Sequence, residues 1–292
     1  MQKYALVTPA RNEEEFIEGT IRSMISQTHL PVRWVIVSDG STDQTEAIVR
    51  RYLPDHPWIQ LVIRPKRQHR DFAGKVHCFN AGHEQLAGLE YDVVGNLDAD
   101  LTFEPDYFEF LLSRFDIMPK LGVAGTPFVE GKVSYDYRFT NIEHVSGACQ
   151  LFRRECYEAI GGYSPIAGGG IDWVAVTTAR MKGWQTRTFL ERSCLHHRPM
   201  GTATVGNFRA LYKLGKQDYY LGGHFLWQVF RGAFQLTRRP WIIGGFCLFA
   251  GYCSAMLSRT PRSVSPELME FHQGEQMLRL RNFFLRRKKQ AS

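Results

Sequence analysis

Over the first 126 residues, short apolar runs alternate with longer segments in which apolar side chains recur every three or four positions. The short runs have the length and composition of buried strands, and they lie at 4–7, 33–38, 59–63 and 93–97. The longer segments are typical of amphipathic helices, and they lie at 14–27, 75–86 and 105–118, with a further helix carrying Ala47, Ile48 and Tyr52. Ser41 and Gln44 have the spacing of a capping box that opens this further helix. Strands that alternate with helices predict an α/β fold with a mostly parallel sheet and helices on both faces.

The pattern continues more irregularly to about residue 195. Residues 146–152 predict a strand rich in small side chains, which a short helix and the glycine run 168–170 follow. A helix is expected at 171–182, and 186–195 has the alternation of one more strand. No internal repeat or low-complexity linker interrupts this order.

From Gly206 onward the sequence becomes rich in aromatic residues and arginine. A helix is expected over 219–236, and 241–257 contains 17 residues without a charge. A membrane span needs about 20 apolar residues, so the uncharged segment is short for one. The segment 267–289 predicts a basic amphipathic helix that ends in a run of arginine and lysine. Such segments favour a helical region that lies on a membrane face, although helices covering the sheet or an oligomer interface are alternatives.

Charge divides the chain in the same place. The net charge is +7, with 36 Lys and Arg against 29 Asp and Glu. Residues 1–200 hold 22 basic and 25 acidic side chains (−3), whereas residues 201–292 hold 14 and 4 (+10). The second part therefore calls for an anionic partner. The charge asymmetry and the interleaved aromatic residues and arginines favour an anionic membrane surface, and no nucleic-acid partner is expected.

Cysteine use and the amino terminus bear on location. The six cysteines form no CxxC pair and no metal-ligand spacing, which favours free thiols in a reducing compartment. Strand-like sequence begins at Lys3, and nothing before it resembles a signal peptide. We expect the protein at the cytoplasmic face of the cell membrane, as a peripheral or monotopic protein.

The strand at 93–97 ends in the most informative pair of side chains, Asp98 and Asp100. Residues two apart on an extended chain face the same way, so both carboxylates can look into one site at a carboxyl edge of the sheet. Two unpaired carboxylates repel, and a divalent cation removes that cost while binding phosphate oxygens. The alternative is an acidic turn after a strand, which is common.

Other loops at the same edge of the sheet narrow the class of nucleotide-binding protein. No GxGxxG follows the first strand and no GxxxxGK[ST] occurs, which argues against a dinucleotide dehydrogenase and a P-loop NTPase. Lys75, just after Gly74, is placed to contact a phosphate, or else it is a solvated lysine at a helix start.

Four motifs in order resemble family 2 glycosyltransferases of the GT-A fold: residues 8–14 (TPARNEE), 38–43 (SDGSTD), 73–75 (AGK) and 98–100 (DAD). The resemblance covers about residues 1–195. It implies a catalytic nucleotide-sugar-binding domain at 1–200, and the basic, aromatic-rich composition of 201–292 predicts a separate helical region there. Nucleotide-sugar contacts are implied for Pro9, Ala10, Arg11, Glu13, Asp39, Lys75, Asp98, Ala99 and Asp100.

The resemblance also implies roles in the reaction. Asp100, with Asp98, holds Mg²⁺ or Mn²⁺ on the diphosphate, and a histidine near 196–197 completes the metal site, with His197 assigned and His196 as the alternative. In the family, a Glu-Asp pair occupies the position of residues 171–172, and its Asp acts as the general base. Asp172 matches that Asp, but Ile171 stands in place of the Glu. The other interpretation of Asp172 is the N-cap of the helix that follows. The QxxRW signature of processive synthases is absent, which favours transfer of one sugar per encounter.

Three hypotheses follow. The first is a metal-dependent inverting glycosyltransferase that moves one sugar from a nucleotide sugar to a lipid-linked or saccharide acceptor, in polysaccharide or glycolipid synthesis. The second is a sugar nucleotidyltransferase, which would need a basic, glycine-rich loop that residues 8–15 do not supply. The third is a catalytically silent scaffold with the same fold, which only Ile171 encourages.

Overall fold

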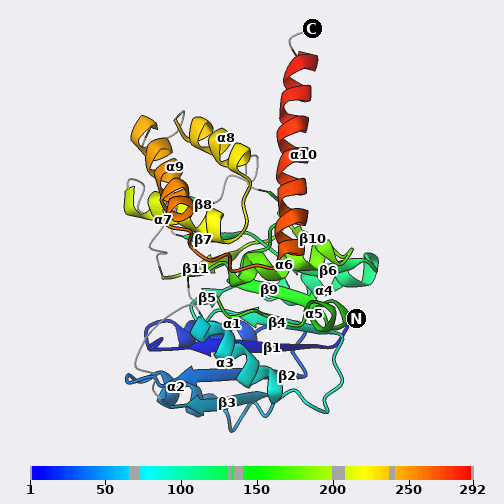
Figure 1. Ribbon diagram of the computed structural model, residues 1–292. Helices are drawn as coiled ribbons and strands as arrows, with labels where there is room; N and C mark the ends of the chain where they lie inside the picture. The colour runs from blue at the N-terminus through cyan, green and yellow to red at the C-terminus, as the bar shows by residue number, and fades with distance from the viewer. Residues whose placement is uncertain are drawn as a thin grey trace. The chain divides into compact units, whose positions relative to one another are not determined.

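The computed structural model describes residues 2–65, 73–130, 133–134, 141–166, 168–198, 208–236 and 241–290 (Figure 1). The chain forms two compact units, Met1–Pro199 and Met200–Ser292. Each unit is described by itself below.

The first unit is built on a seven-stranded sheet in the order β10-β6-β9-β4-β1-β2-β3. Its strands are β1 (Tyr4–Ala10), β2 (Arg33–Asp39), β3 (Ile59–Arg64), β4 (Val93–Leu97), β6 (Leu121–Gly125), β9 (Cys149–Arg153) and β10 (Gln185–Thr188). All neighbours pair in parallel except β9, which is antiparallel to both β4 and β6. The predicted α/β architecture with a mostly parallel sheet is therefore confirmed.

Helices pack on both faces of this sheet. A Cβ built on Gly82 of α3 (Ala73–Glu84) would lie 2.4 Å from Val7 on β1, so that helix lies close to the sheet. Phe108 of α4 (Tyr107–Ile117) stacks on Tyr4 of the same strand, with ring centroids 5.2 Å apart. Positions 4 and 7 of one strand point to opposite faces, so α3 and α4 cover opposite sides.

The helix after β2 begins differently from the prediction. α2 (Thr45–Tyr52) follows an Asp43 side chain that accepts hydrogen bonds from the Thr45 backbone N–H (3.0 Å) and from the Thr45 hydroxyl (2.6 Å). Ser41 instead accepts from the Asn12 backbone N–H, at 3.2 Å. The predicted capping box is wrong because the Ser41 hydroxyl serves the loop between β1 and α1 (Ile17–Ile25).

A small four-stranded sheet lies in the order β5-β11-β7-β8, formed by β5 (Leu101–Thr102), β11 (Cys194–His196), β7 (Phe128–Glu130) and β8 (Val133–Ser134). The single strand predicted at 186–195 is thus two strands. Its first part, β10, joins the large sheet beside β6, whereas β11 pairs with β5 and β7. Two further helices, α5 (Arg154–Ile160) and α6 (Ile171–Met181), follow β9.

The second unit is helical. It contains α7 (Phe208–Tyr220), α8 (Phe225–Gln235), α9 (Trp241–Leu257) and α10 (Pro266–Gln290). The helix predicted over 219–236 is interrupted, because Gly222 adopts φ +89° and residues 221–224 form a turn. The uncharged segment 241–257 is a helix with the predicted bounds. Among the described helices, none combines the length and the hydropathy that crossing a bilayer requires.

Candidate functional site

The carboxyl ends of three neighbouring strands bring most of the predicted site residues to one edge of the large sheet. Strand β1 pairs in parallel with both β4 and β2, so the ends that carry Ala10, Asp39 and Asp98 lie side by side. Each is followed by one of the loops in which the sequence predicted binding residues. Parallel pairing explains why three separate motifs meet.

Two donors hold the carboxylate of Asp98. Lys75 Nζ, from α3, donates to Asp98 Oδ1 at 2.5 Å, and the side-chain amide of Asn96 donates to the same oxygen at 3.1 Å. The backbone N–H of Asp98 donates to the Ala148 carbonyl, at 2.8 Å. Lys75 is therefore an ion-pair partner of Asp98 in the structure, and any phosphate contact would share this ammonium with the carboxylate.

Gly147 joins Asp98 to Asp172. Its carbonyl accepts from Lys75 Nζ (3.0 Å) and from the Asn96 amide (2.6 Å), the same two donors that hold Asp98. Its N–H donates to Asp172 Oδ2, at 3.1 Å. One peptide segment thus fixes two carboxylates that are 74 positions apart in the sequence.

Asp172 is not the N-cap of α6. The residue before the helix is Gly170, with φ +93°, and no side chain caps the helix there. Asp172 is the second helical residue, and its carboxylate is directed at Gly147. Ile171, which replaces the glutamate of the expected pair, is 7% exposed and belongs to the core.

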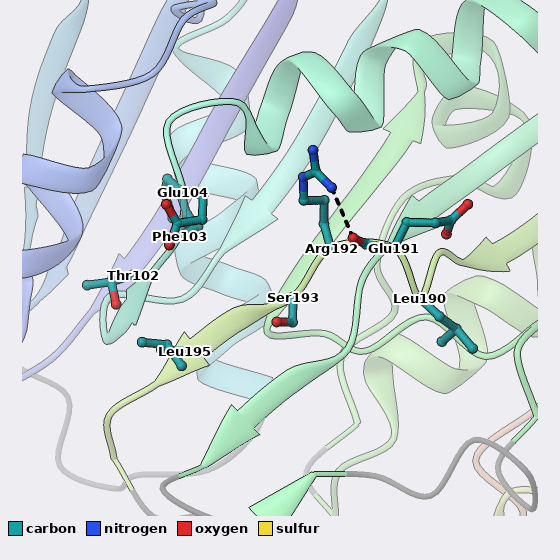
Figure 2. Close-up of a pocket in the computed structure, with 8 residues that line it drawn as sticks. All are labelled: Thr102, Phe103, Glu104, Leu190, Glu191, Arg192, Ser193 and Leu195. Atoms are coloured by element: carbon teal, nitrogen blue, oxygen red, sulfur yellow. Dashed lines mark hydrogen bonds between the residues drawn. The ribbon is translucent and has the colours of Figure 1, made fainter.

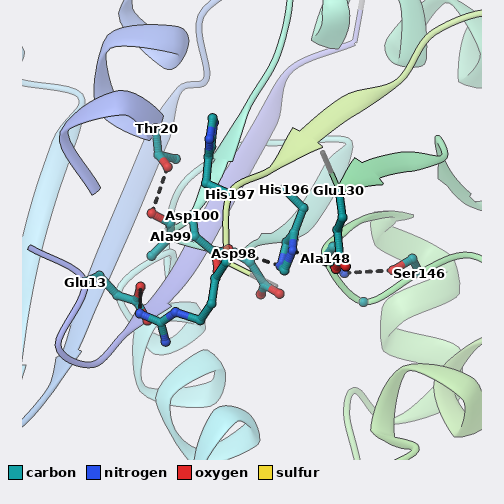
Figure 3. A network of polar contacts seen from close by, with 12 residues as sticks. Glu13, Thr20, Asp98, Ala99, Asp100, Glu130, Ser146, Ala148, His196 and His197 are labelled. Atoms are coloured by element: carbon teal, nitrogen blue, oxygen red, sulfur yellow. Dashed lines mark hydrogen bonds and ion pairs between the residues drawn. The ribbon is translucent and has the colours of Figure 1, made fainter. Parts of the chain in front are cut away.

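Asp100 lies beside His196. The residue is 7% exposed, and its Oδ1 is buried without a hydrogen-bond partner, 3.5 Å from His196 Nε2 (Figure 3). Burial, followed by the charge of Asp98, raises the pKa of Asp100, and the neighbouring His196, Arg198 and Lys75 oppose this rise. A buried carboxylate oxygen of this kind is suited to a cation.

Glu130 lies on the far side of the same imidazole. Its Oε1 is 3.1 Å from His196 Nδ1, although the approach is off the line of a good hydrogen bond. The side chains of Glu130, His196 and Asp100 are 11%, 8% and 10% exposed, so the imidazole sits between two buried carboxylates.

The structure separates the two histidines. The His197 ring points away from that of His196 (Figure 3), stacks on Phe16 with centroids 6.4 Å apart, and lies 2.8 Å from the Thr102 hydroxyl through Nε2. Only its backbone N–H reaches Asp100, donating to the carbonyl at 3.0 Å. His196 ends β11 and His197 is the next residue, so their side chains turn to opposite sides of the extended chain. The ring that neighbours Asp100 is therefore that of His196, and the assignment to His197 does not fit.

Two arginines meet the other predicted carboxylates. Arg198 Nη2 is 2.6 Å from Glu13 Oε2 and also donates to the Asn12 carbonyl, at 3.2 Å. Arg11 Nη1 is 3.6 Å from Asp39 Oδ2. Both carboxylates are nearly buried, so each predicted carboxylate at this edge has a guanidinium partner: Arg11, which the sequence also predicted as a contact, and Arg198, which it did not.

The remaining predicted residues form the frame of this edge. Pro9 and Ala10 end β1, where Ala10 is 1% exposed. The Ala99 carbonyl accepts from the hydroxyl of Thr20 on α1, at 2.8 Å, which ties the Asp98–Asp100 loop to that helix.

Sequence reasoning missed four residues of this arrangement: Asn96, Gly147, Glu130 and Arg198. A signal existed for Asn96, because it lies two residues before Asp98 on the same strand face. Gly147 lies in the predicted small-residue strand, but nothing singled it out. The positions of Glu130 and Arg198 depend on how the small sheet and the segment after β11 fold back, which local pattern does not reveal.

A divalent cation fits one corner of the site. Within the described residues, no group of three or more His, Cys, Asp and Glu side chains could hold a metal ion alone. Mg²⁺ in phosphate-binding sites, however, usually takes only one or two protein ligands and completes its shell with substrate phosphates and water. The orphaned Asp100 Oδ1 with the adjacent His196 nitrogen meets that requirement.

A separate cavity of about 380 Å³ lies next to β5 and β11 (Figure 2). Its lining includes Thr102, Glu191, Arg192 and Leu195. Leu195 precedes His196 on β11 and therefore points to the opposite side of the strand, away from Asp100. None of the predicted site residues lines this cavity.

Comparisons with known proteins agree on one family. The model of the family described as Glycosyl transferase family 2 matches residues 5–215. Poly-beta-1,6-N-acetyl-D-glucosamine synthases from Staphylococcus aureus (strain COL) and from Staphylococcus epidermidis are each 29% identical over 136 residues. The match covers 46% of this chain but only 31% of each synthase.

Solved structures share the fold. A mannosyltransferase from Pyrobaculum calidifontis, in complex with GDP-Man and Mn²⁺, superposes with a TM-score of 0.58 at 19% identity, covering 96% of this chain and 81% of that one. TarS 1–349 of S. aureus, in complex with UDP-GlcNAc, gives a TM-score of 0.56 at 14% identity, covering 92% and 78%. At these identities the likeness establishes the GT-A-like α/β fold, as the sequence resemblance implied.

Proposed function

The chain belongs to glycosyl transferase family 2, and on this premise we propose that it is a metal-dependent, inverting glycosyltransferase that moves one sugar from a nucleotide sugar to an acceptor hydroxyl. The observation that carries the proposal is the Gly147 connection. It holds Asp172, the proposed base, and Asp98, the proposed donor contact, at one edge of the sheet. A transfer reaction requires the base and the donor contact in a fixed relation, and this peptide segment supports both.

The donor nucleotide lies, in this proposal, across the ends of β4, β1 and β2. Asp39, paired with Arg11, and Glu13, paired with Arg198, contact the nucleoside and fix its orientation. Asp98 lies near the ribose or the donor sugar, and Lys75 supports it there. Pro9, Ala10 and Ala99 surround the nucleotide with backbone groups, a role that requires no charged side chain.

Mg²⁺ or Mn²⁺ would be held by Asp100 and His196. When bound, the cation neutralises the negative charge that develops on the departing nucleoside diphosphate. Glu130 Oε1 lies 3.1 Å from Nδ1 of the imidazole without an aligned hydrogen bond, and its negative charge favours the proton on that nitrogen, which leaves Nε2 free to face the metal. This pattern of a carboxylate behind a ligating histidine accounts for two buried carboxylates around one ring.

Asp172 takes the proton from the acceptor hydroxyl. Its Oδ2 accepts the Gly147 N–H, which fixes the carboxylate and leaves the other oxygen for the acceptor. The oxygen of the acceptor then attacks the anomeric carbon from the side opposite the leaving diphosphate, so that the configuration inverts. Ile171, in the core at the start of α6, helps to hold the helix and not the substrate.

The acceptor and the pathway are proposed by class. The staphylococcal relatives are synthases of a polysaccharide, which supports a role in polysaccharide or glycolipid synthesis with a lipid-linked or saccharide acceptor. All six cysteines lie among the described residues and none forms a disulfide, which supports a reducing, cytoplasmic location for the catalytic unit.

A donor screen with product analysis tests the function. Purified protein is incubated with UDP-GlcNAc, other UDP-sugars or GDP-Man, Mn²⁺, and either a polyprenyl-phosphate-linked sugar or a free oligosaccharide. Release of nucleoside diphosphate together with a product of inverted anomeric configuration, assigned by NMR, is the expected result. Retention of configuration in the product would contradict the proposal. So would a wild-type protein that turns over none of the donors, although it and Asp172→Asn bind donor equally well.

A further inference from the structure

The second unit exposes large apolar side chains along two neighbouring helices, α8 and α9. Nine of these side chains are between 38% and 79% exposed, and together they are called the α8–α9 apolar face: Phe225, Leu226, Val229, Leu236, Ile242, Ile243, Phe246, Met256 and Leu257. No charged residue occurs anywhere in α9. Soluble proteins scatter exposed apolar residues singly, whereas a row of this kind marks an interaction surface.

The inner sides of the same helices are tightly packed. A Cβ built on Gly251 of α9 would lie 2.0 Å from the Tyr212 carbonyl oxygen of α7, and one on Gly245 would lie 2.6 Å from the Gly232 carbonyl oxygen of α8. The side-chain amide of Gln228 donates to the Leu248 carbonyl, at 3.1 Å. Glycines and Gln228 therefore let these helices approach closely, around the buried side chains of Leu248 and Tyr252, while the nine large apolar side chains of the α8–α9 apolar face point outward.

The apolar rows of the two helices meet. Phe225 of α8 lies against Phe249 of α9, with ring centroids 6.0 Å apart. At the other end, Leu236 approaches Gly245, because its Cδ2 would lie 2.6 Å from a Cβ built there. The helices run antiparallel and side by side (Figure 1), so their exposed rows border one another along the line of contact.

Charge identifies the occupant of this face. Arginines mark both ends of α9: Arg238 and Arg239 precede it in the sequence, and the exposed Arg259 follows it. Residues 201–292 carry 14 basic against 4 acidic side chains. A purely apolar row between arginines, on a strongly basic unit, matches the boundary between headgroups and acyl chains of an anionic leaflet.

We propose that the α8–α9 apolar face lies in the headgroup–acyl boundary of an anionic membrane, with both helix axes along the membrane plane. The orientation follows from the arginines, because insertion of the hairpin end-on would take Arg238 and Arg239 into the hydrocarbon. With 17 residues, α9 is about 25 Å long and lies along the surface over its whole length. The proposal concerns the second unit alone and goes beyond the transfer reaction.

Vesicle flotation of the full chain tests the proposal without any sugar donor. Wild-type protein is expected to float with vesicles that contain phosphatidylglycerol, and less with phosphatidylcholine alone or at high salt. Phe246→Glu and Val229→Glu, at side chains 66% and 43% exposed, should each lower the partition coefficient at least about tenfold. Ile117→Glu, on a side chain 69% exposed in the first unit, is the matched control and should float as the wild type does.

Two further measurements decide between occupants and orientations. If Phe246→Glu changes the sedimentation coefficient and leaves flotation unchanged, the face joins copies of the chain and the proposal fails.

Ile242→Trp and Leu257→Trp, at opposite ends of α9, should be quenched equally by lipids brominated at one depth. Unequal depths would overturn the orientation. Unchanged circular dichroism in the glutamate variants establishes that lost flotation is not lost folding. Failure of flotation would leave the proposed transfer reaction intact.

Discussion

Gly147 stands where any side chain would disturb the proposed base. A Cβ built there would lie 2.9 Å from the Asp172 Cβ and 3.3 Å from its Oδ2. A contact under 3.0 Å would force the neighbouring atoms to shift. The Gly147 carbonyl also accepts hydrogen bonds from Lys75 Nζ and from the Asn96 amide, so such a shift would disturb these groups as well. At the scale of single residues, the proposed site therefore depends on a residue that has no side chain, and on the carboxylates that it positions.

The first prediction concerns Asp172. Replacement by Asn preserves the shape and the oxygen that accepts the Gly147 N–H, but removes the group that takes a proton. We expect donor affinity close to that of the wild type and a transfer rate lower by about 10²–10⁴-fold. Glu143→Gln, outside the Gly147 connection, is the control. Single-turnover kinetics measure both, and a variant that keeps more than about a tenth of the wild-type rate would place the base elsewhere.

The second prediction separates the two histidines. His196→Ala removes the imidazole beside Asp100 and should weaken Mn²⁺-dependent binding of nucleoside diphosphate at least about tenfold. His197→Ala removes a ring that contacts Thr102 and Phe16, so the same affinity should change less than about threefold. Isothermal titration calorimetry with and without Mn²⁺ measures the difference. Equal losses in both variants would count against a metal site at Asp100 and His196.

Part of this site was predictable from sequence. The strand-end carboxylates Asp98 and Asp100 and the lysine at position 75 stand in motifs, and the structure brings them to one edge. The role of Gly147 was not predictable, because it depends on β9 pairing antiparallel to β4 with Asn96 opposite Gln150. The choice between His196 and His197 needed the register of β11 against β5.

At the scale of elements, the first four strands were predicted better than the ends of helices, whereas strands β5 to β8 were not predicted. An apolar run in the sequence indicates a buried strand, as it does for β2 and β4. Helix starts depend on which nearby hydroxyl or carboxylate satisfies the first N–H groups, and the loop after β1 takes Ser41 away from α2. The turn at 221–224 was missed because aromatic periodicity continues through it, while Gly222 has a left-handed backbone.

The third prediction concerns the crossing of α7 and α9. Gly251→Ala places a methyl group 2.0 Å from the Tyr212 carbonyl oxygen, so the helices must separate, at a cost of about 1–3 kcal/mol in the free energy of unfolding. Gly274→Ala on α10 meets nothing within 4 Å and should stabilise by about 0.5–1 kcal/mol. Urea denaturation followed by circular dichroism gives both values. A neutral Gly251→Ala would mean that α7 and α9 are not in close contact.

At the scale of the whole molecule, charge and fold divide the chain at nearly the same place. Residues 1–200 carry 22 basic and 25 acidic side chains, and residues 201–292 carry 14 and 4. Along the chain, the first compact unit ends at Pro199 and the second begins at Met200. In our proposals the acidic unit binds a polyanionic nucleotide and the basic unit binds an anionic surface, so only the first needs help from a cation.

The last prediction follows from that need. The cations near the donor edge, Lys75, Arg11 and Arg198, already lie beside Asp98, Asp39 and Glu13. Asp100 adds a buried carboxylate oxygen without a hydrogen-bond partner. A nucleoside diphosphate would bring further negative charge to this edge, so it should bind weakly unless Mg²⁺ or Mn²⁺ accompanies it.

Calorimetry of the full chain with UDP, with Mn²⁺ and with both can test this requirement. UDP or Mn²⁺ alone should shift the unfolding temperature little. Together, at about a hundred times the dissociation constant of UDP, they should stabilise the first unit by about 2.7 kcal/mol, and a chelator should remove the effect. Asp100→Ala should abolish the joint effect, whereas the Gly251→Ala background should retain it, since that substitution lies in the second unit. Full stabilisation by UDP in the presence of the chelator would show that the arginines and Lys75 suffice, and the metal requirement would then be wrong.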